Sequence, residues 1–329
     1  MRFGLIGAGR IGRIHGGNVA ARADSTLVAI ADADPAASQA LARETGAVVT
    51  SAEDLLADRS IDAVLICAPT DMHADLIEQA ARAKKAVFCE KPVDLSSDRI
   101  RSCLRVVEAE GTPLMIGFNR RFDPNFSALK ARLVQGLAGE IELIHIISRD
   151  PGPPPVSYIA RSGGLFRDMM IHDFDLARHL LGEEPVAVFA AGSSLVDPAI
   201  GEAGDIDTAA VILETRSGKI AQISNSRRAT YGYDQRIEVH GSKGLIRAQN
   251  IHETTVEIAT EKGFTSDPVQ NFFLERYANA YRLELDHFVT AVTRGEAPQP
   301  SGQDGLRAQL LSDAATESAQ THRRIEIPA

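Results

Sequence analysis

The sequence predicts two domains: an N-terminal α/β domain on a parallel sheet, then an α+β domain built on a largely antiparallel open sheet. In the first third, short apolar runs alternate with alanine-rich amphipathic stretches, as in a parallel sheet covered by helices on both faces. After about residue 120, strand-like runs follow one another with short connections, which indicates antiparallel pairing. We therefore expect domains over residues 1–120 and 121–329, with the C-terminal helix free to pack back on the first domain.

The expected elements follow from these patterns. In the first domain the strands are expected at residues 3–6, 26–31, 63–67, 86–89 and 114–117, with helices at 35–45 and 72–84. In the second domain, helices are expected at residues 125–135, 166–181, 272–294 and 303–320. Its strands are expected at residues 141–148, 186–191, 208–214, 219–227, 235–240, 245–248 and 255–259. A proline-rich stretch at 151–155 is interpreted as an ordered loop near the domain junction.

Composition excludes several classes of protein. The 329 residues are 44% hydrophobic and 24% charged, which is typical of a globular protein. The formal net charge of −9 argues against a general nucleic-acid binder. Three cysteines without a CxxC pair favour a reducing compartment, and no apolar run approaches the ~18 residues needed to span a membrane. We expect a soluble cytoplasmic protein, without a signal peptide, that binds neither nucleic acid nor membrane.

A glycine-rich turn at residues 7–12, GAGRIG, follows the first expected strand and opens a helix. Gly7 permits the tight turn, Gly9 lets the backbone approach a pyrophosphate, and Gly12 lets the helix pack closely on the strand. The helix N-terminus offers N–H groups and a favourable dipole to that anion. The motif alone also fits an ordinary turn, but in this context it predicts a Rossmann-type dinucleotide site.

Asp32 ends the second expected strand at the spacing of the acid that accepts hydrogen bonds from the ribose hydroxyls. No Arg or Lys occupies residues 33–37 to bind a 2′-phosphate, so we expect NAD rather than NADP. The alternative is that Asp32 caps a turn or helix before Pro35. Two other side chains each allow two interpretations. Arg10 either contacts the pyrophosphate or is solvated. His73 either contacts the cofactor or lies on the surface.

Two segments carry candidate catalytic groups. Lys91 lies in the tripeptide Glu90-Lys91-Pro92, at the end of a strand of the cofactor sheet, where ligands of such sheets bind. Asp168 and His172 are four residues apart on one expected helix, so the carboxylate can orient the imidazole and stabilise its protonated form. Taken singly, Lys91 also fits a solvated strand end, and Asp168 with His172 fits an exposed helical pair.

Together, the fingerprint, the tripeptide and the Asp168–His172 pair resemble the glucose-fructose oxidoreductase, inositol dehydrogenase and rhizopine-catabolism family, and within it the inositol 2-dehydrogenases. The resemblance extends over essentially the whole chain. It is carried further by residues 88–92, 117–123, 164–175 and 231–234. It implies that His172 is the general base, that Asp168 is its partner, and that Lys91 stabilises the developing alkoxide.

The resemblance also implies a substrate site, at Arg120, Asp150 and Tyr233. Position 150 is Asp in this chain, whereas a well-known relative has Asn there. A carboxylate only accepts hydrogen bonds, so the hydroxyl orientations that it recognises can differ. We therefore expect a polyol substrate whose stereochemistry stays open.

The complete set of expected site residues follows. The expected cofactor contacts are Gly7, Gly9, Arg10, Ile11, Gly12, Asp32, Pro69, His73, Glu90 and Lys91. The expected substrate contacts are Lys91, Arg120, Asp150, Asp168, His172 and Tyr233, of which Lys91, Asp168 and His172 are expected to be catalytic. No metal is expected, because the histidines show no zinc spacing.

The leading expectation is an NAD-dependent oxidation of myo-inositol to 2-keto-myo-inositol (scyllo-inosose) by a homotetramer that associates through the open sheet. Dehydrogenation of another cyclitol or an aldose remains a close alternative, since these substrates differ by single hydroxyl configurations. A redox-neutral NAD-dependent glycosidase is a second alternative. A non-enzymatic sensor or regulator is a third, and the presence of all three catalytic candidates argues against it.

Overall fold

The computed structural model describes residues 1–327, apart from the side chain of Ala160. Within it the chain forms two compact units. The first comprises Met1–Asn119 and Ala280–Gln309, and the second comprises Arg120–Asn279 and the chain from Leu310 onward. Each unit is thus assembled from two separate stretches of sequence.

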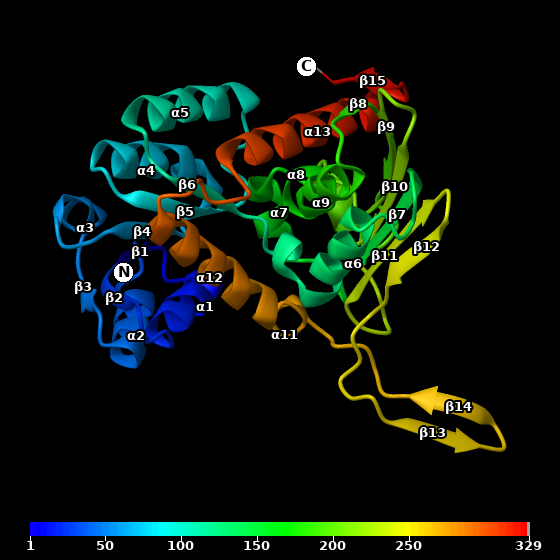
Figure 1. Cartoon of the computed structure of the whole chain (residues 1–329), viewed down its shortest axis with the longest axis horizontal. Coiled ribbons are helices and arrows are strands. Elements are labelled where there is room, and N and C mark those ends of the chain that lie inside the picture. The colour runs from blue at the N-terminus through cyan, green and yellow to red at the C-terminus, as the bar shows by residue number, and fades with distance from the viewer. Residues whose placement is uncertain (328–329) are drawn as a thin grey trace. The chain divides into compact units, whose positions relative to one another are not determined.

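The first unit is built on a six-stranded parallel sheet with the order β3-β2-β1-β4-β5-β6 (Figure 1). The strands are β1 (Arg2–Ile6), β2 (Thr26–Ala31), β3 (Val48–Val49), β4 (Ala63–Ile66), β5 (Ala86–Glu90) and β6 (Leu114–Gly117). The strand order reverses between β1 and β4. In open α/β sheets this switch point lies under the ligand, at the carboxyl ends of the strands. The expected Rossmann-type parallel sheet is confirmed.

Helices cover this sheet on both faces, as its near-continuously apolar strands require. Figure 1 shows α1 (Arg10–Ala20), α2 (Pro35–Thr45) and α12 (Ala278–Arg294) below the sheet, with α4 (Thr70–Arg82) and α5 (Ser97–Glu110) above it. Helix α3 (Ala52–Ala57) contacts β1 and β2. Helix α13 (Gly302–Thr321) begins in the first unit and ends in the second.

Local sequence sets the ends of these helices. Helix α2 begins at Pro35, whose fixed φ suits a first turn, and the Asp34 side chain caps it. It ends at Gly46, which has a φ of 77°. Helix α1 differs, because Gly9 precedes it and provides no side-chain cap. The start of α1 is therefore open to an anionic ligand in a way that the capped start of α2 is not.

The second unit is built on a seven-stranded sheet with the order β12-β11-β7-β10-β9-β8-β15. Its strands are β7 (Ile141–Arg149), β8 (Pro185–Ser193), β9 (Thr208–Thr215), β10 (Ile220–Ser226), β11 (Asp234–Gly241), β12 (Gly244–Ala248) and β15 (Ile325–Glu326). All neighbouring pairs are antiparallel except β7 and β10. The expected largely antiparallel sheet is confirmed, with β7 and β10 as its one parallel pair among the described strands.

One face of this sheet packs against helices and the other lies open. Helices α6 (Pro124–Val134) and α9 (Ile171–Leu181) contact the covered face. Along β7 and β9, buried residues alternate with residues that are partly or fully exposed, as expected for a sheet covered on one side. The open face exposes apolar side chains of Phe189, Ile212 and Ile220.

Two expected helices are interrupted in the structure. The single helix expected at 166–181 is wrong, because α8 (Leu165–Asp168) ends before α9 begins at Ile171. The Met170 N–H bonds to the Leu165 carbonyl five residues back, so the i→i−4 ladder breaks there. The single helix expected at 272–294 is α11 (Phe273–Arg276) and α12, separated at Tyr277.

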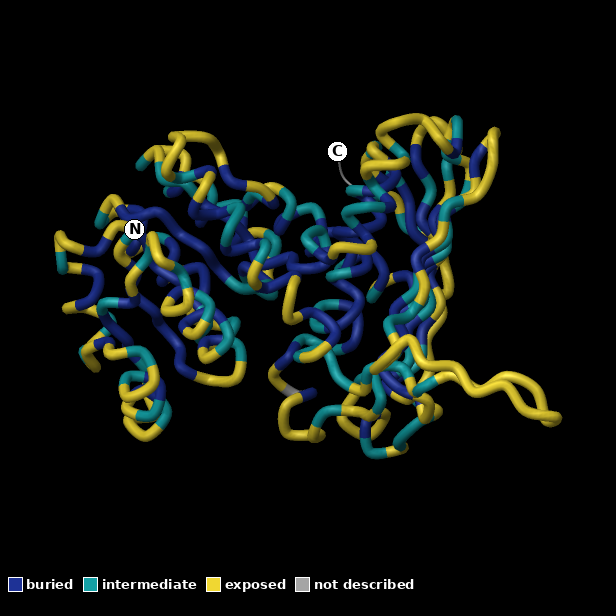
Figure 2. Tube along the Cα trace, turned by 60° about the horizontal axis from the view of Figure 1, so that its bottom comes forward, coloured by how far each residue is buried: buried dark blue, intermediate teal, exposed yellow. Residues whose placement is uncertain are grey.

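Several short elements complete the second unit. They are a 3₁₀ turn η1 (Asn119–Phe122), helices α7 (Val156–Ser162) and α10 (Pro198–Glu202), and strands β13 (Glu257–Thr260) and β14 (Gly263–Ser266). Strands β13 and β14 form an isolated, fully exposed hairpin, which is the yellow arm in Figure 2. The strand expected at residues 255–259 is the first strand of this hairpin.

Candidate active site

The glycine-rich turn of the first unit is closed by backbone contacts. Gly7 has a φ of 98°, and a Cβ built there would lie 2.4 Å from the Cys67 carbonyl group. A Cβ on Gly12 would lie 1.9 Å from the Gly7 carbonyl oxygen. Both positions therefore require glycine for the fold itself, as the sequence pattern predicts.

Gly9 is different, because a Cβ built there would meet no atom within 4 Å. Its φ of −67° is open to any residue. The protein alone therefore gives no reason for glycine at this position. The open space and the uncapped start of α1 at Arg10 fit a dinucleotide pyrophosphate that approaches the backbone.

Asp32, the expected ribose acid, anchors the turn from the end of β2. Its carboxylate accepts hydrogen bonds from the backbone N–H of Ala8 (2.5 Å) and of Asp34 (2.6 Å). Of the capping alternative, the helix cap is provided by Asp34, two residues further on, whereas Asp32 itself caps the turn before α2 through the Asp34 N–H. Each carboxylate oxygen accepts a backbone N–H and retains lone-pair capacity for a ribose hydroxyl.

His73 is buried, so its expected surface position is wrong. Its Nδ1 lies 2.7 Å from the Pro92 carbonyl and its Nε2 lies 2.7 Å from the Ala68 carbonyl. Both ring nitrogens thus face backbone carbonyls, and the expected cofactor contact through His73 stays a prediction. Burial lowers the pKa of His73, and the two carbonyls oppose that shift. His73 ties the loop after β4 to the Lys91–Pro92 peptide, which is cis.

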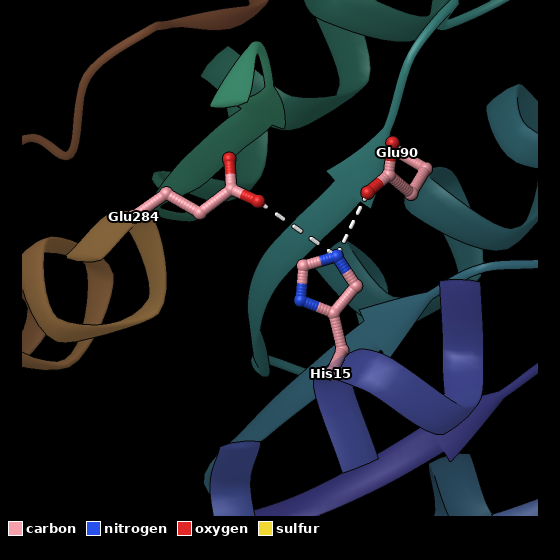
Figure 3. Close-up of side chains that lie close together, drawn as sticks. All are labelled: His15, Glu90 and Glu284. Atoms are coloured by element: carbon pink, nitrogen blue, oxygen red, sulfur yellow. Dashed lines mark hydrogen bonds and ion pairs between the residues drawn. The ribbon is translucent and has the colours of Figure 1, made fainter. Parts of the chain in front are cut away.

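Glu90, the last residue of β5, belongs to a buried cluster with His15 of α1 and Glu284 of α12 (Figure 3). The Glu90 carboxylate lies 2.8 Å from the Nε2 of His15, and Glu284 lies 3.8 Å from the same atom. Burial, and then the charge of Glu90, raise the pKa of Glu284 well above its usual value. The three donor atoms lie within 4.8 Å of one another, which is close enough for metal ligands.

The apolar surroundings of this cluster favour a protonated carboxyl group over a bound metal cation. The His15 ring lies 4.8 Å from the ring of Phe88 and 5.7 Å from that of Tyr281. A protonated, neutral Glu284 avoids a second buried negative charge in this dry environment. The cluster thereby links the helix of the glycine-rich turn to the strand end that precedes Lys91, a half-buried residue.

In the second unit, Asp168 and His172 lie on separate short elements, at the end of α8 and the start of α9. The Asp168 carboxylate accepts a hydrogen bond from the Tyr158 hydroxyl (2.9 Å). It also lies 3.7 Å from the Arg227 guanidinium. Because the helix breaks between Asp168 and His172, the single helical face expected from their four-residue spacing is not formed.

Arg120 anchors a buried polar network beside these groups. Its guanidinium donates to the Asp173 carboxylate and to the Ser148 hydroxyl (2.9 Å). Asp173 also accepts from Ser148 (2.6 Å) and from the Asn225 amide (2.9 Å). Although burial disfavours the charge of Arg120, the carboxylate of Asp173 raises its pKa. Arg120 is therefore a permanent cation that the fold holds in place.

Asp150 and Tyr233, the other expected substrate residues, belong to the same part of the unit. Desolvation raises the pKa of Asp150 to about 6, and the charges of Arg227 and Arg120 oppose that shift. Tyr233 is buried, with its ring 5.9 Å from the Tyr277 ring. Arg120, Asp150 and Tyr233 influence one another electrostatically, so the structure brings the three expected residues together.

Sequence reasoning missed Tyr158, Asp173 and Arg227. Asp173 directly follows His172, but its main partner Arg120 is distant in sequence, so no local pattern indicates the pair. Arg227 falls at the last position of the strand expected at 219–227, where a charged residue normally faces solvent. The parallel pairing of β10 with β7, which brings Arg227 beside the end of β7, is a property of the fold alone.

Two family models match the chain. Residues 1–118 match the GFO_IDH_MocA model described as "Oxidoreductase family, NAD-binding Rossmann fold". Residues 130–327 match the model described as "Oxidoreductase family, C-terminal alpha/beta domain". The chain belongs to the GFO_IDH_MocA oxidoreductase family. The resemblance drawn from the sequence is confirmed, and with it an NAD-dependent oxidoreductase.

Relatives of known name match over their full length. An inositol 2-dehydrogenase from Rhizobium meliloti is 56% identical over 99% of both chains. A myo-inositol 2-dehydrogenase from Thermotoga maritima is 46% identical over 99% of this chain and 98% of its own. A crystal structure of scyllo-inositol dehydrogenase from Lactobacillus casei, with bound NAD(H) and scyllo-inositol, superposes with a TM-score of 0.93. That protein is 31% identical, and the match covers 99% of this chain and 98% of the other.

The helices of residues 1–327 of this GFO_IDH_MocA member are short or carry many polar residues. Within that range, no helix combines the length and the apolar character needed to cross a bilayer.

Proposed function

We propose that this chain oxidises myo-inositol to 2-keto-myo-inositol (scyllo-inosose) with NAD as the hydride acceptor. The observation that carries the proposal is the 56% identity, over 99% of both chains, to a protein named inositol 2-dehydrogenase. The polar residues of the second unit also suit a polyol, because they offer both a permanent donor, Arg120, and an acceptor carboxylate, Asp150.

In the proposed reaction, His172 removes the proton of the reacting hydroxyl and Asp168 stabilises the resulting imidazolium. The ammonium of Lys91 hydrogen-bonds the same oxygen and stabilises the alkoxide as it develops. NAD, when bound, accepts the hydride from the carbinol carbon. Lys91 belongs to the first unit, and Asp168 and His172 belong to the second.

The proposed cofactor contacts are the glycine-rich turn, Asp32, and the segments that follow β4 and β5. Gly9 provides the open approach for the pyrophosphate, and Pro69 starts the helix that follows β4. Asp32 would bind the ribose hydroxyls and repel a 2′-phosphate, which favours NAD over NADP.

The test is turnover of a panel of polyols, measured as NADH absorbance, with NADP in parallel. The panel contains myo-, scyllo- and chiro-inositol and several aldoses. We expect the highest kcat/KM with myo-inositol and NAD. No turnover of any polyol would overturn the dehydrogenase proposal, whereas turnover of another isomer alone would correct the substrate.

We further propose that residues 1–120 form the NAD-binding domain and residues 121–329 the substrate domain, and that a cytoplasmic homotetramer forms through the open sheet. The exposed Phe189 and Ile212 are cross-strand neighbours on that face, so association would remove them from water. Light scattering should give a mass of four chains. Replacing Ile212 by Lys should reduce that mass, and an unchanged tetramer would place the interface elsewhere.

A further inference from the structure

Arg227 lies immediately after β10, beside Asp150 at the end of β7. The two strands are parallel, and the last pair in their register joins Arg149 with Ser226. The pairing continues one step, because the Asp150 N–H donates to the Ser226 carbonyl (3.0 Å). Asp150 and Arg227 are thus successive neighbours at the carboxyl ends of two adjacent strands.

The register also places both side chains on the covered face of the sheet. Side chains alternate along a strand, so Asp150 shares a face with Ser148, and Arg227 shares a face with Asn225. Ser148 and Asn225 are both buried and both donate to Asp173. Arg227 therefore extends the buried polar network of Arg120 and Asp173 by one residue.

The guanidinium of Arg227 is almost completely buried, at 1% exposed, yet two of its nitrogens make no hydrogen bond to the described residues. Its Nη2 lies 3.7 Å from Asp168 and 3.8 Å from Asp205. Asp205 in turn accepts the Leu165 N–H (3.0 Å) at the start of α8. Arg227 therefore bridges two carboxylates at opposite ends of this short helix.

Burial of a charged guanidinium at this position costs folding free energy. A buried guanidinium keeps its proton, so its desolvation must be offset by nearby carboxylates. Three carboxylates surround it: Asp150, Asp168 and Asp205. Of these, Asp205 holds the start of α8, while Asp150 and Asp168 are the expected substrate and catalytic acids.

We propose that Arg227 is a positioning residue, a buried counter-ion that holds Asp150 and Asp168 as oriented carboxylates facing the polyol. The inference rests on the proposed function, and it deepens it by explaining how this chain uses Asp at position 150. An uncharged Asn there would need no counter-ion. Asp150 and Arg227 therefore act as a charge pair, in which the carboxylate requires the guanidinium as its counter-ion.

The pH dependence follows from the groups around Asp150. These are Arg227 after β10, Arg120 in η1, Asp168 in α8, Asp173 in α9 and Tyr233 before β11. Of the cations, Arg227 opposes the raised pKa of Asp150 most strongly. Removing Arg227 should raise that pKa by about 1–3 pH units. The rising limb of kcat/KM against pH should then move to higher pH by the same amount.

The experiment is a double-mutant cycle with Arg227→Met, Asp150→Asn and the combined variant. Arg227→Met should lower kcat/KM by about 10²-fold, because it leaves buried carboxylates without their counter-ion. Asp150→Asn/Arg227→Met should recover at least tenfold of that loss and abolish the limb that Asp150 contributes. Arg227→Lys, which keeps the charge, should be intermediate. Arg228→Met, at the adjacent exposed arginine, is the matched control and should match the wild type.

Two readouts separate this inference from the proposed function. Wild-type turnover tests the function alone. Thermal unfolding of the wild type and the three variants of the cycle needs no substrate, and the double variant should be more stable than Arg227→Met. NAD affinity should be unchanged throughout. Equal impairment of Arg227→Met and the double variant, in both activity and unfolding, would overturn the pairing with Asp150. An unchanged pH profile in Arg227→Met would also overturn it.

Discussion

Substitution of the three glycines of the turn should separate folding from cofactor binding. At Gly7 and Gly12 an added Cβ would meet backbone atoms at 2.4 Å and 1.9 Å. Backbone atoms cannot rotate away, so both positions must distort the turn. We expect Gly7→Ala to cost about 2–5 kcal/mol of folding free energy, from overpacking of about 1–3 kcal/mol and left-handed strain of about 1–2 kcal/mol.

Gly9→Ala should leave the fold nearly unchanged and still impair NAD binding. No atom lies within 4 Å of the added Cβ, and only the loss of a glycine N-cap, at about 1 kcal/mol or less, affects folding. The methyl group should displace the pyrophosphate from one or more N–H donors. A hydrogen bond to a charged group contributes about 1.5–3 kcal/mol, so the Kd for NAD should rise by roughly 10- to 150-fold.

The assay is NAD titration by calorimetry combined with urea unfolding of each variant. Gly17→Ala is the matched control, since Gly17 is exposed in the same helix and its added Cβ also meets nothing within 4 Å. It should stabilise the protein by roughly 0.5–1 kcal/mol and leave the Kd unchanged. If Gly9→Ala bound NAD as tightly as the wild type, the pyrophosphate would not lie at this turn.

Three further outcomes are expected. His172→Ala should lower kcat by about 10²- to 10⁴-fold with an unchanged Kd for NAD; a collapse of NAD binding would make His172 structural. Asp32→Ala should weaken NAD binding and also destabilise the turn through loss of its two backbone hydrogen bonds, so an unchanged Kd would contradict the ribose role. Glu284→Gln should gain stability relative to the wild type as the pH rises, measured by urea unfolding at pH 5 and pH 8. The raised pKa of Glu284 contributes stability that is complete below its unfolded value and is lost as the pH rises through the folded value. A difference that is constant with pH would contradict a protonated Glu284.

The first unit was predictable because its signals are local. Helix α2 lies at the expected residues 35–45, since Pro35 and Gly46 mark its ends within the sequence itself. Strand β3 was missed because its two residues have no periodicity. The return of residues 280–309 to this unit was predictable only in part. The sequence allowed the C-terminal helix to pack back on the first domain, but the return of α12 depends on contacts such as that of Phe288 with Phe3.

In the second unit, residue types were predictable but their partners were not. Position 168 and position 172 matched a familiar pattern, yet the helix between them breaks because Met170 bonds to Leu165. Likewise, His73 looked accessible from its place in a first helical turn. Its burial follows from packing against the loop at Pro92, nineteen residues away.

Two aspartates of this polar network, Asp173 and Asp150, differ in how the fold stabilises their charge. Asp173 accepts hydrogen bonds from three side chains, so its charge is part of the scaffold. The charge of Asp150 is opposed by desolvation and supported by Arg227 and Arg120, which leaves its pKa at about 6. The residue expected to contact the polyol therefore changes charge just below neutrality. Because a protonated Asp150 can donate a hydrogen bond as well as accept one, mildly acidic pH should weaken discrimination between cyclitol epimers before it unfolds the protein. Comparing kcat/KM for myo- and scyllo-inositol between pH 5 and pH 8 tests this, and a ratio that is constant over that range would show that Asp150 does not select the substrate.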